Sequence, residues 1–160
     1  MIALNLQSVL IKEFQTLFTG QLFPAYSQNV NDNPDPAPLN IYSQALPQEG
    51  NGDLGVYAPY LVVQLINGKQ DDEIGPEDVK VILNIGIHSY DEENQGHVFI
   101  LNIINTIRQH LFLKRTFGKK YFVTLPFEWK LNDDDIWPYF VGSIETNWNL
   151  PIIMPDDPNL

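Results

Sequence analysis

The feature that most constrains this fold is a change in hydrophobic period within residues 79–113. From Val79 to Ile87 every second residue is aliphatic, and these residues alternate with Lys80, Asn84, Gly86 and His88, which is typical of a strand with one buried face. After an acidic turn the spacing becomes three and four, so the apolar residues share one face of a helix that begins near Gln95. This face contains Ile100, Ile104, Ile107 and Leu111, widened by Val98, Leu101 and Ile103. We therefore expect a strand leading into a helix packed against it, with Gly118 as the helix stop.

An apolar stripe near the N-terminus predicts a second helix, capped by Asn5 or Ser8 and ended by Gly20. The stripe consists of Leu6, Val9, Leu10, Phe14, Leu17 and Phe18. We expect this helix to pack on the sheet or on a neighbouring subunit.

Three further segments predict strands. Residues 60–66 form a nearly continuous apolar run, which suits a central strand covered on both faces. Residues 120–129 contain Pro126, which argues for a sheet edge or a strand end because proline cannot donate to a ladder. Residues 139–148 alternate apolar and polar side chains, as expected of a strand with one polar side.

The order of these elements predicts a single α+β domain over residues 1–160. With 160 residues, of which 44% are hydrophobic, the chain is long enough for one real core and short for two. The order α-β-β-α-β-β predicts an α/β sandwich, in which a mostly antiparallel sheet of about four strands carries two helices on one face. The other face would then be open to solvent or to another subunit.

Two segments outside these elements are candidates for contact with a partner. Residues 27–59 form a long loop rich in proline, asparagine and glycine, and residues 151–160 form a proline-bounded tail. Loops of this length are usually functional or disordered, and apolar residues within them suggest docking on a partner surface. The candidate interface residues are Leu39, Ile41, Tyr42, Leu46, Tyr57, Trp137, Tyr139, Ile152, Ile153 and Met154.

The charge of the chain argues against nucleic-acid binding. The chain has nine basic and 20 acidic residues, for a formal net charge of −11. This negative charge repels the phosphates of a nucleic acid. The one basic cluster, residues 108–120, is explained first as charge at the helix C-terminus. The chain has no cysteine, which removes disulfides and thiolate chemistry and suits a reducing cytoplasm. No signal peptide or spanning segment is expected, and we predict no membrane partner.

Two groups of residues are candidates for a metal site. His88 and His97 could converge with Asp91 if the strand end and the helix start lie together, although an exposed strand histidine and a first-turn helix histidine need no metal. Residues 68–78 are strongly acidic but lack the alternating ligands of a calcium loop, which favours a solvated turn. We predict no metal and no cofactor.

No catalytic motif is present. The sequence contains no phosphate loop, no nucleophile elbow and no His-Glu-x-x-His. Glu128 and Glu145 could act as an acid–base pair if the last two strands are adjacent, but exposed carboxylates on a sheet face are the commoner interpretation. The tryptophans, Trp129, Trp137 and Trp148, are more often core and interface anchors than a sugar-binding platform. We therefore predict that the protein is not an enzyme.

The packing residues of the C-terminal two thirds resemble a known family. The strand, turn and helix of residues 85–113 are followed by Leu-Pro-Phe-Glu-Trp at 125–129, Trp-Pro-Tyr-Phe-Val-Gly at 137–142 and Thr-Asn-Trp-Asn-Leu-Pro at 146–151. In order and spacing, residues 60–151 resemble tail-completion (tail terminator) proteins of tailed bacteriophages and prophages. The long loop of residues 27–59 departs from a compact member.

This resemblance implies a structural protein of the virion tail, assembled in the host bacterial cytoplasm. Such a protein forms a ring, commonly of six subunits, that caps the tail tube, ends its polymerisation and offers a surface to the head-completion (connector) protein. Its partners would be other copies of itself, the tail tube protein and the connector. DNA would be only a passing cargo, and a negative lumen would let it pass without sticking. The family has no catalytic residues to transfer.

Two other classes of function stay open. Another phage neck or baseplate protein with the same sheet would differ in stoichiometry and in whether it binds tube ends or the head portal. A small cytoplasmic ligand-binding domain or enzyme would be favoured by a clean monomer whose melting temperature rises with ligand.

Overall fold

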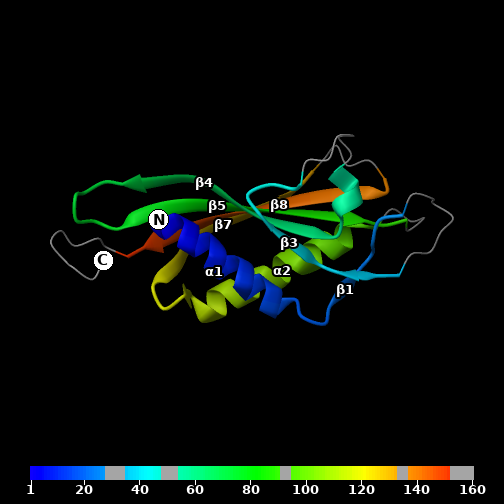
Figure 1. The fold of residues 1–160 in the computed structure, drawn as a ribbon, viewed down its shortest axis with the longest axis horizontal. Coiled ribbons are helices and arrows are strands. Elements are labelled where there is room, and N and C mark those ends of the chain that lie inside the picture. Colours follow the sequence, from blue (N-terminus) through cyan, green and yellow to red (C-terminus); the bar gives the residue numbers. More distant parts are fainter. Residues whose placement is uncertain (28–34, 48–53, 91–94, 133–136, 152–160) are drawn as a thin grey trace.

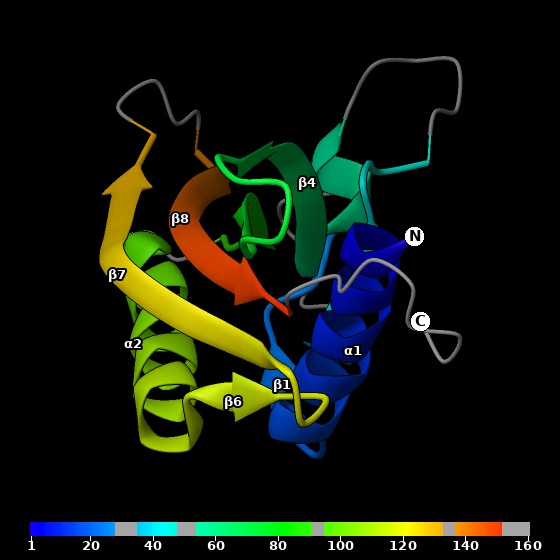
Figure 2. The same ribbon diagram turned by 90° about the vertical axis from the view of Figure 1, so that its left-hand side faces the viewer.

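The computed structural model describes residues 1–27, 35–47, 54–90, 95–132 and 137–151. It is an α+β fold with a curled six-stranded sheet, two helices and a separate pair of short strands, β1 and β2 (Figures 1 and 2). The sheet has the order β3-β4-β5-β8-β7-β6, and every pair is antiparallel except β3 with β4. The elements are α1 Ile2–Leu17, β1 Leu22–Phe23, β2 Ala37–Pro38, β3 Asn40–Ser43, the 3-10 helix η1 Leu54–Tyr57, β4 Tyr60–Gln70, β5 Glu77–His88, α2 His97–Lys114, β6 Thr116–Phe117, β7 Tyr121–Leu131 and β8 Tyr139–Leu150.

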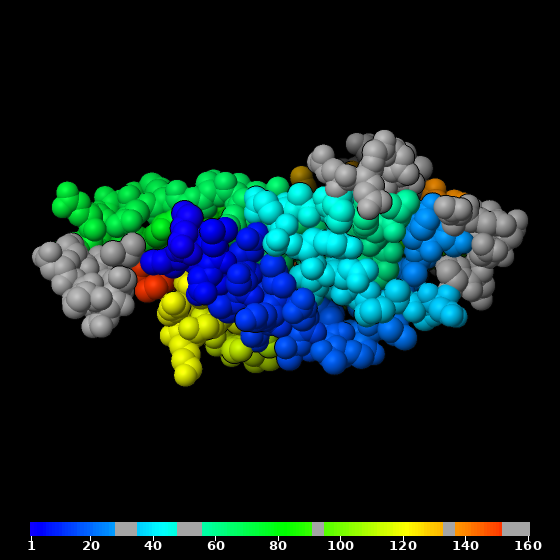
Figure 3. All heavy atoms as spheres, in the orientation of Figure 1, coloured from blue at the N-terminus to red at the C-terminus, as the bar shows by residue number. Residues whose placement is uncertain are grey.

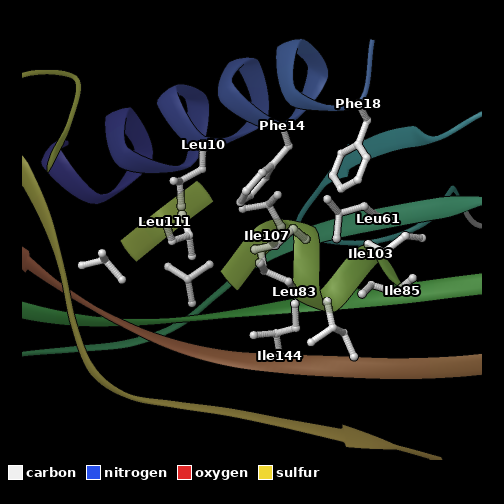
Figure 4. Packing of buried hydrophobic residues seen from close by; sticks show 14 of the residues in the cluster. Leu10, Phe14, Phe18, Leu61, Leu83, Ile85, Ile103, Ile107, Leu111 and Ile144 are labelled. Carbon is white, nitrogen blue, oxygen red and sulfur yellow. The ribbon is translucent and has the colours of Figure 1, made fainter. Parts of the chain in front are cut away.

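Both helices share one apolar core with one face of the sheet. Figure 4 shows Leu10, Phe14 and Phe18 of the α1 segment above side chains of α2 and of the central strands. The predicted helical face of α2 is confirmed, since Ile100, Ile104, Ile107 and Leu111 are all buried, together with Ile103. Val98 is not part of this face because 42% of it is exposed. The prediction of two helices on one face of a mostly antiparallel sheet is therefore confirmed.

The prediction of about four strands is wrong, because the sheet has six. The four long strands β4, β5, β7 and β8 are those that the sequence predicts, and the short β3 and β6 add one strand at each edge. β3 lies within the segment predicted as an irregular loop and pairs in parallel with the first residues of β4. Such a short strand has no periodic signal of its own, so its pairing depends on the neighbour that β4 provides.

Helix ends also differ from prediction. α1 begins at Ile2 rather than near Asn5 or Ser8, and no side-chain cap forms there. α2 ends at Lys114, followed by Arg115 at φ +65°, so Gly118 is not its stop and instead occupies the turn between β6 and β7. Hydrophobic periodicity reports the buried face of a helix more directly than its ends.

β7 follows the prediction made from its proline. The pairing of β7 with β8 is interrupted between Thr124 and Glu128, where the register shifts around Pro126. On the outer side, β6 pairs only with Phe122 and Tyr121, so Pro126 lies on an edge where no ladder donor is required.

The centre of the sheet holds one buried polar group. The Thr146 hydroxyl donates to the Val81 carbonyl at 2.7 Å and accepts from the Trp148 indole N–H at 2.9 Å. Thr146 is 1% exposed, so both partners would lose a hydrogen bond in a site without water. This hydroxyl joins β8 to β5 and orients the largest side chain of the core.

We expect Thr146→Val to lower the free energy of unfolding by about 1–3 kcal/mol, because the shape is kept while a buried carbonyl and indole N–H lose their partner. Urea denaturation followed by circular dichroism measures this change. The control is Thr124→Val on β7, whose hydroxyl makes a longer, 3.3 Å bond in a half-buried site. Equal effects at both positions would contradict the proposed role of the buried hydroxyl.

A charged contact fastens the two helices together. Glu13 of α1 accepts from Lys114 of α2 at 2.7 Å, and His110 Nε2 lies 2.8 Å from the same oxygen. Burial raises the pKa of Glu13, but the hydrogen bonds from Lys114 and His110 outweigh this effect and bring the pKa below its ordinary value of 4.5.

The lowered pKa predicts how this contact depends on pH. The contribution of ionised Glu13 to stability is present above pH 4.5 and is lost as the pH falls through the lower, folded-state pKa. We therefore expect Glu13→Gln to lower stability at neutral pH and to flatten the loss of stability below pH 4.5, measured by urea denaturation across pH. Glu73→Gln on the exposed hairpin is the control, and an equal flattening there would contradict the assignment.

Candidate functional site

The face of the sheet opposite the helices is the first candidate surface. Alternate residues of the strands point to it, because their neighbours in sequence fill the core on the other side. Three shallow hollows lie along this face, lined among others by Asn84, Lys130, Ser143 and Glu145. We call it the open face.

One half of the open face is covered by the chain itself. Tyr60, Val62 and Ala58 form a second buried apolar group, and partly buried residues from neighbouring segments pack on it. We call this group the tyrosine cluster; its partly buried members are Tyr42, Leu46, Tyr57 and Tyr139. The hydroxyls of Tyr60 and Tyr139 share a hydrogen bond. Burial and the neighbouring Tyr57 raise the pKa of Tyr42, so its hydroxyl stays neutral at physiological pH.

The other half of the open face is polar. Lys80 on β5 forms an ion pair of 2.8 Å with Glu145 on β8, and each side chain is 35% exposed. The Asn84 amide donates to Gln64 at 3.1 Å, and the Asn149 amide donates to Asp78 at 3.1 Å. This half is therefore suited to contact with water rather than to burial against an apolar partner.

Glu128 and Glu145 are neighbours, as the adjacency of their strands requires, and lie opposite each other in the β7–β8 ladder. The hydrogen bond from Lys80 lowers the pKa of Glu145, which keeps this carboxylate ionised. A general acid needs the opposite shift. This arrangement gives the pair a role in the charge network of the sheet face.

His88 is buried rather than exposed, contrary to the expectation for a strand residue on a wet face. Its ring lies edge-on to the rings of Tyr26 and Tyr90, with centroids 4.9 Å away in both cases, and Tyr90 in turn contacts Trp137 at 5.9 Å. Sequence reasoning missed this aromatic stack because Tyr26 is distant in the chain. The stack fills the end of the sheet next to the tyrosine cluster.

The metal hypotheses gain no support from the part of the chain that the structure describes. No group of three or more histidine, aspartate or glutamate side chains there could hold a metal ion. Asp91 lies outside the described residues. In the acidic hairpin between β4 and β5, Asp71 pairs with Lys69 at 3.3 Å on the surface, as expected of a solvated turn.

The predicted interface residues fall into four groups. Leu39 is buried in the main core, and Ile41 packs against that core, so these two are used inside the chain. Tyr42, Leu46, Tyr57 and Tyr139 belong to the tyrosine cluster. Trp137 is 40% exposed and contacts Tyr90. Ile152, Ile153 and Met154 lie outside the described residues.

The basic cluster of residues 108–120 is not mainly helix C-terminal charge. Only Lys114 lies in the last turn of α2, while Lys119 and Lys120 follow β6. The cluster therefore belongs to the surface formed by α2 and the β6–β7 turn.

Comparison with known proteins adds no identity. No protein-family model matches the sequence, and no curated protein matches it either. Neither described helix is long and apolar enough to cross a membrane.

Proposed function

We propose that this chain is a structural protein of a bacteriophage or prophage tail that assembles as a ring on the end of the tail tube. The ring ends polymerisation of the tube and presents a surface to the head-completion protein. The proposal rests on the resemblance over residues 60–151 to tail-completion proteins.

One observation about the fold carries the proposal. Residues 60–151 form the continuous unit β4-β5-α2-β6-β7-β8, which contains the four long strands and one of the two helices. The aromatic residues that carry the resemblance have packing roles there, since Trp148 and Phe140 are buried and Phe127 contacts Phe112 on α2. The resemblance therefore concerns residues that pack in the core of this unit.

Charge supports the same reading. The chain carries a formal charge of −11, which suits a channel that DNA crosses without binding. The virion tail would be its location, after assembly in the host cytoplasm. Neutralising acidic residues should alter DNA passage only where they line the channel.

The absolute mass in solution tests this proposal. Light scattering at low and high protein concentration, with and without isolated uncapped tail tubes, should give a ring, with about 110 kDa for six chains of 18.3 kDa. The ring forms either alone or on tube ends. Tubes from mature virions, whose ends are already occupied, are the control.

Two outcomes would contradict the proposal. A monomer that is indifferent to concentration and to uncapped tubes would overturn the ring. A ring that binds the head portal but not tube ends would favour a different neck protein.

A further inference from the structure

The two edges of the sheet carry opposite charge. Six of the nine basic residues of the chain fall within residues 108–130, on α2, directly after α2, in the β6–β7 turn and on β7. Those exposed on α2, at its C-cap and in the β6–β7 turn without an ion pair to any described residue are Arg108, Arg115, Lys119 and Lys120. We call this surface the basic flank.

The opposite edge is acidic. Asp71, Asp72 and Glu73 lie in the turn of the hairpin between β4 and β5, and Glu77 and Asp78 begin β5, so five acidic residues fall within eight positions. Figure 3 shows the hairpin surface, in green, at one end of the molecule. We call the hairpin and the second half of β4 the acidic flank. β4 and β7 are separated in the sheet by β5 and β8, and among the described residues no ion pair joins the two flanks.

Exposed apolar residues accompany both charged flanks. Leu113 and Leu125 on the basic side are 87% and 69% exposed, while Ile66 and Ile74 on the acidic side are 42% and 55% exposed. Large apolar side chains grouped on a charged edge are typical of contact surfaces.

Both flanks also offer open strand edges. β6 pairs with only two residues of β7, and β3 pairs with β4 only as far as Val63. In the described part of the chain, the remaining outer edges of β7 and of β4 beyond Leu65 have no strand partner. Unpaired edges of this kind readily accept a second chain.

The two flanks lie at the same level along the strands. Glu77 of the hairpin is opposite Leu150 of β8, and Phe122 of β7 is opposite Asn149. Copies related by rotation about an axis along the strands could therefore meet flank to flank without a rise from one copy to the next. A head-to-tail contact without a rise closes into a ring when the rotation between neighbouring copies divides a full turn.

We propose that copies of this chain associate head to tail, with the basic flank of one copy against the acidic flank of the next. The inference rests on the proposed ring and names the surfaces that build it. The open face is a poorer contact surface, because one half is covered by the tyrosine cluster and the other half is polar. Charge complementarity then fixes the direction of assembly.

Cross-linking tests which surfaces meet. The chain has no cysteine, so Lys119→Cys with Glu73→Cys places one thiol on each flank, and Leu125→Cys with Ile66→Cys samples the strand edges. Under the assembling conditions, a short bis-maleimide should give a ladder of covalent multimers up to the ring with at least one pair. Each single-cysteine variant can give no more than dimers. Lys119→Cys with Ser143→Cys probes contact with the open face and should give no ladder.

Charge reversal provides an independent arm. Lys119→Glu should weaken assembly about tenfold or more, because it places like charges together, and adding Glu73→Lys should restore assembly. The matched control, Lys12→Glu, makes the same change in charge at an exposed site on α1 and should leave assembly within about twofold of wild type.

The outcomes separate this inference from the proposed function. Light scattering could show a ring while neither flank pair gives a cross-linked ladder, or while the pair with Ser143→Cys gives one. Either result would refute contact between the two flanks and leave the proposed ring in place. A monomer that never assembles, even on uncapped tubes, would overturn both. Equal loss with Lys119→Glu and Lys12→Glu would also count against the charge match.

Discussion

Trp148→Ala is expected to lower the free energy of unfolding by about 3–5 kcal/mol, the range for truncating a large aromatic side chain in a core. Trp148 is 1% exposed, its ring lies edge-on to Phe117 at 5.4 Å, and its indole N–H donates to Thr146. The substitution removes apolar burial, an aromatic contact and a hydrogen bond from β8, which lies between β5 and β7. Urea denaturation followed by circular dichroism measures the loss.

Trp129→Ala is the matched control for this prediction. Trp129 lies on the neighbouring strand, where it is 47% exposed, so its truncation should cost less than about 1 kcal/mol. A larger stability loss for Trp129 than for Trp148 would show that the core is not centred on β8.

The long elements could be predicted because their periodicity records burial directly. In β5 and β8 every second side chain is buried through most of the strand, and in α2 the predicted four aliphatic residues fill the core. The adjacency of β7 and β8 follows from a short connection between two strands. These features depend on neighbours in sequence, which a pattern can report.

The remaining parts of the fold depend on contacts between distant segments. β3 is held by parallel pairing with β4, and Leu39 is buried by the core rather than by a partner. Both lie in a stretch whose prolines and glycines suggest an irregular loop. Composition indicates where the backbone can turn, but it does not indicate which aliphatic side chains of a loop are buried in the core of the same chain.

The candidate surfaces show the same division. The acidity of the hairpin and the basic run after Arg108 are visible in the sequence, but only the strand order places them on opposite edges. The sequence pattern predicts that His88 is a solvent-exposed strand residue, yet the rings of Tyr26 and Tyr90 pack against it. The enclosing groups come from other segments, so no local pattern could have indicated them.

Gly86→Ala is expected to cost about 1–3 kcal/mol, because it overpacks a closed site. Gly86 on β5 lies directly opposite Tyr60 on β4, and a methyl group there would approach three atoms of the Tyr60 side chain more closely than 3.0 Å. Tyr60 is 4% exposed and its hydroxyl is bonded to Tyr139, so the ring has little room to move. The glycine is therefore required by the close approach of an aromatic ring across the strands.

Two comparisons isolate this cause. Gly68→Ala on β4 meets the carboxylate of Glu77, a half-exposed side chain that can swing aside, so its cost should stay within about 0.5–1 kcal/mol. In a Tyr60→Ala background the cost of Gly86→Ala should fall by more than half, since the clashing ring is gone. An unchanged cost in that background would assign the effect to the strand backbone instead. Gly86→Ala also tests whether the tyrosine cluster only covers the open face. In that case the variant, at a temperature where it is still folded, should keep flank-to-flank cross-linking intact. Loss of the ladder would place the cluster at the contact between copies.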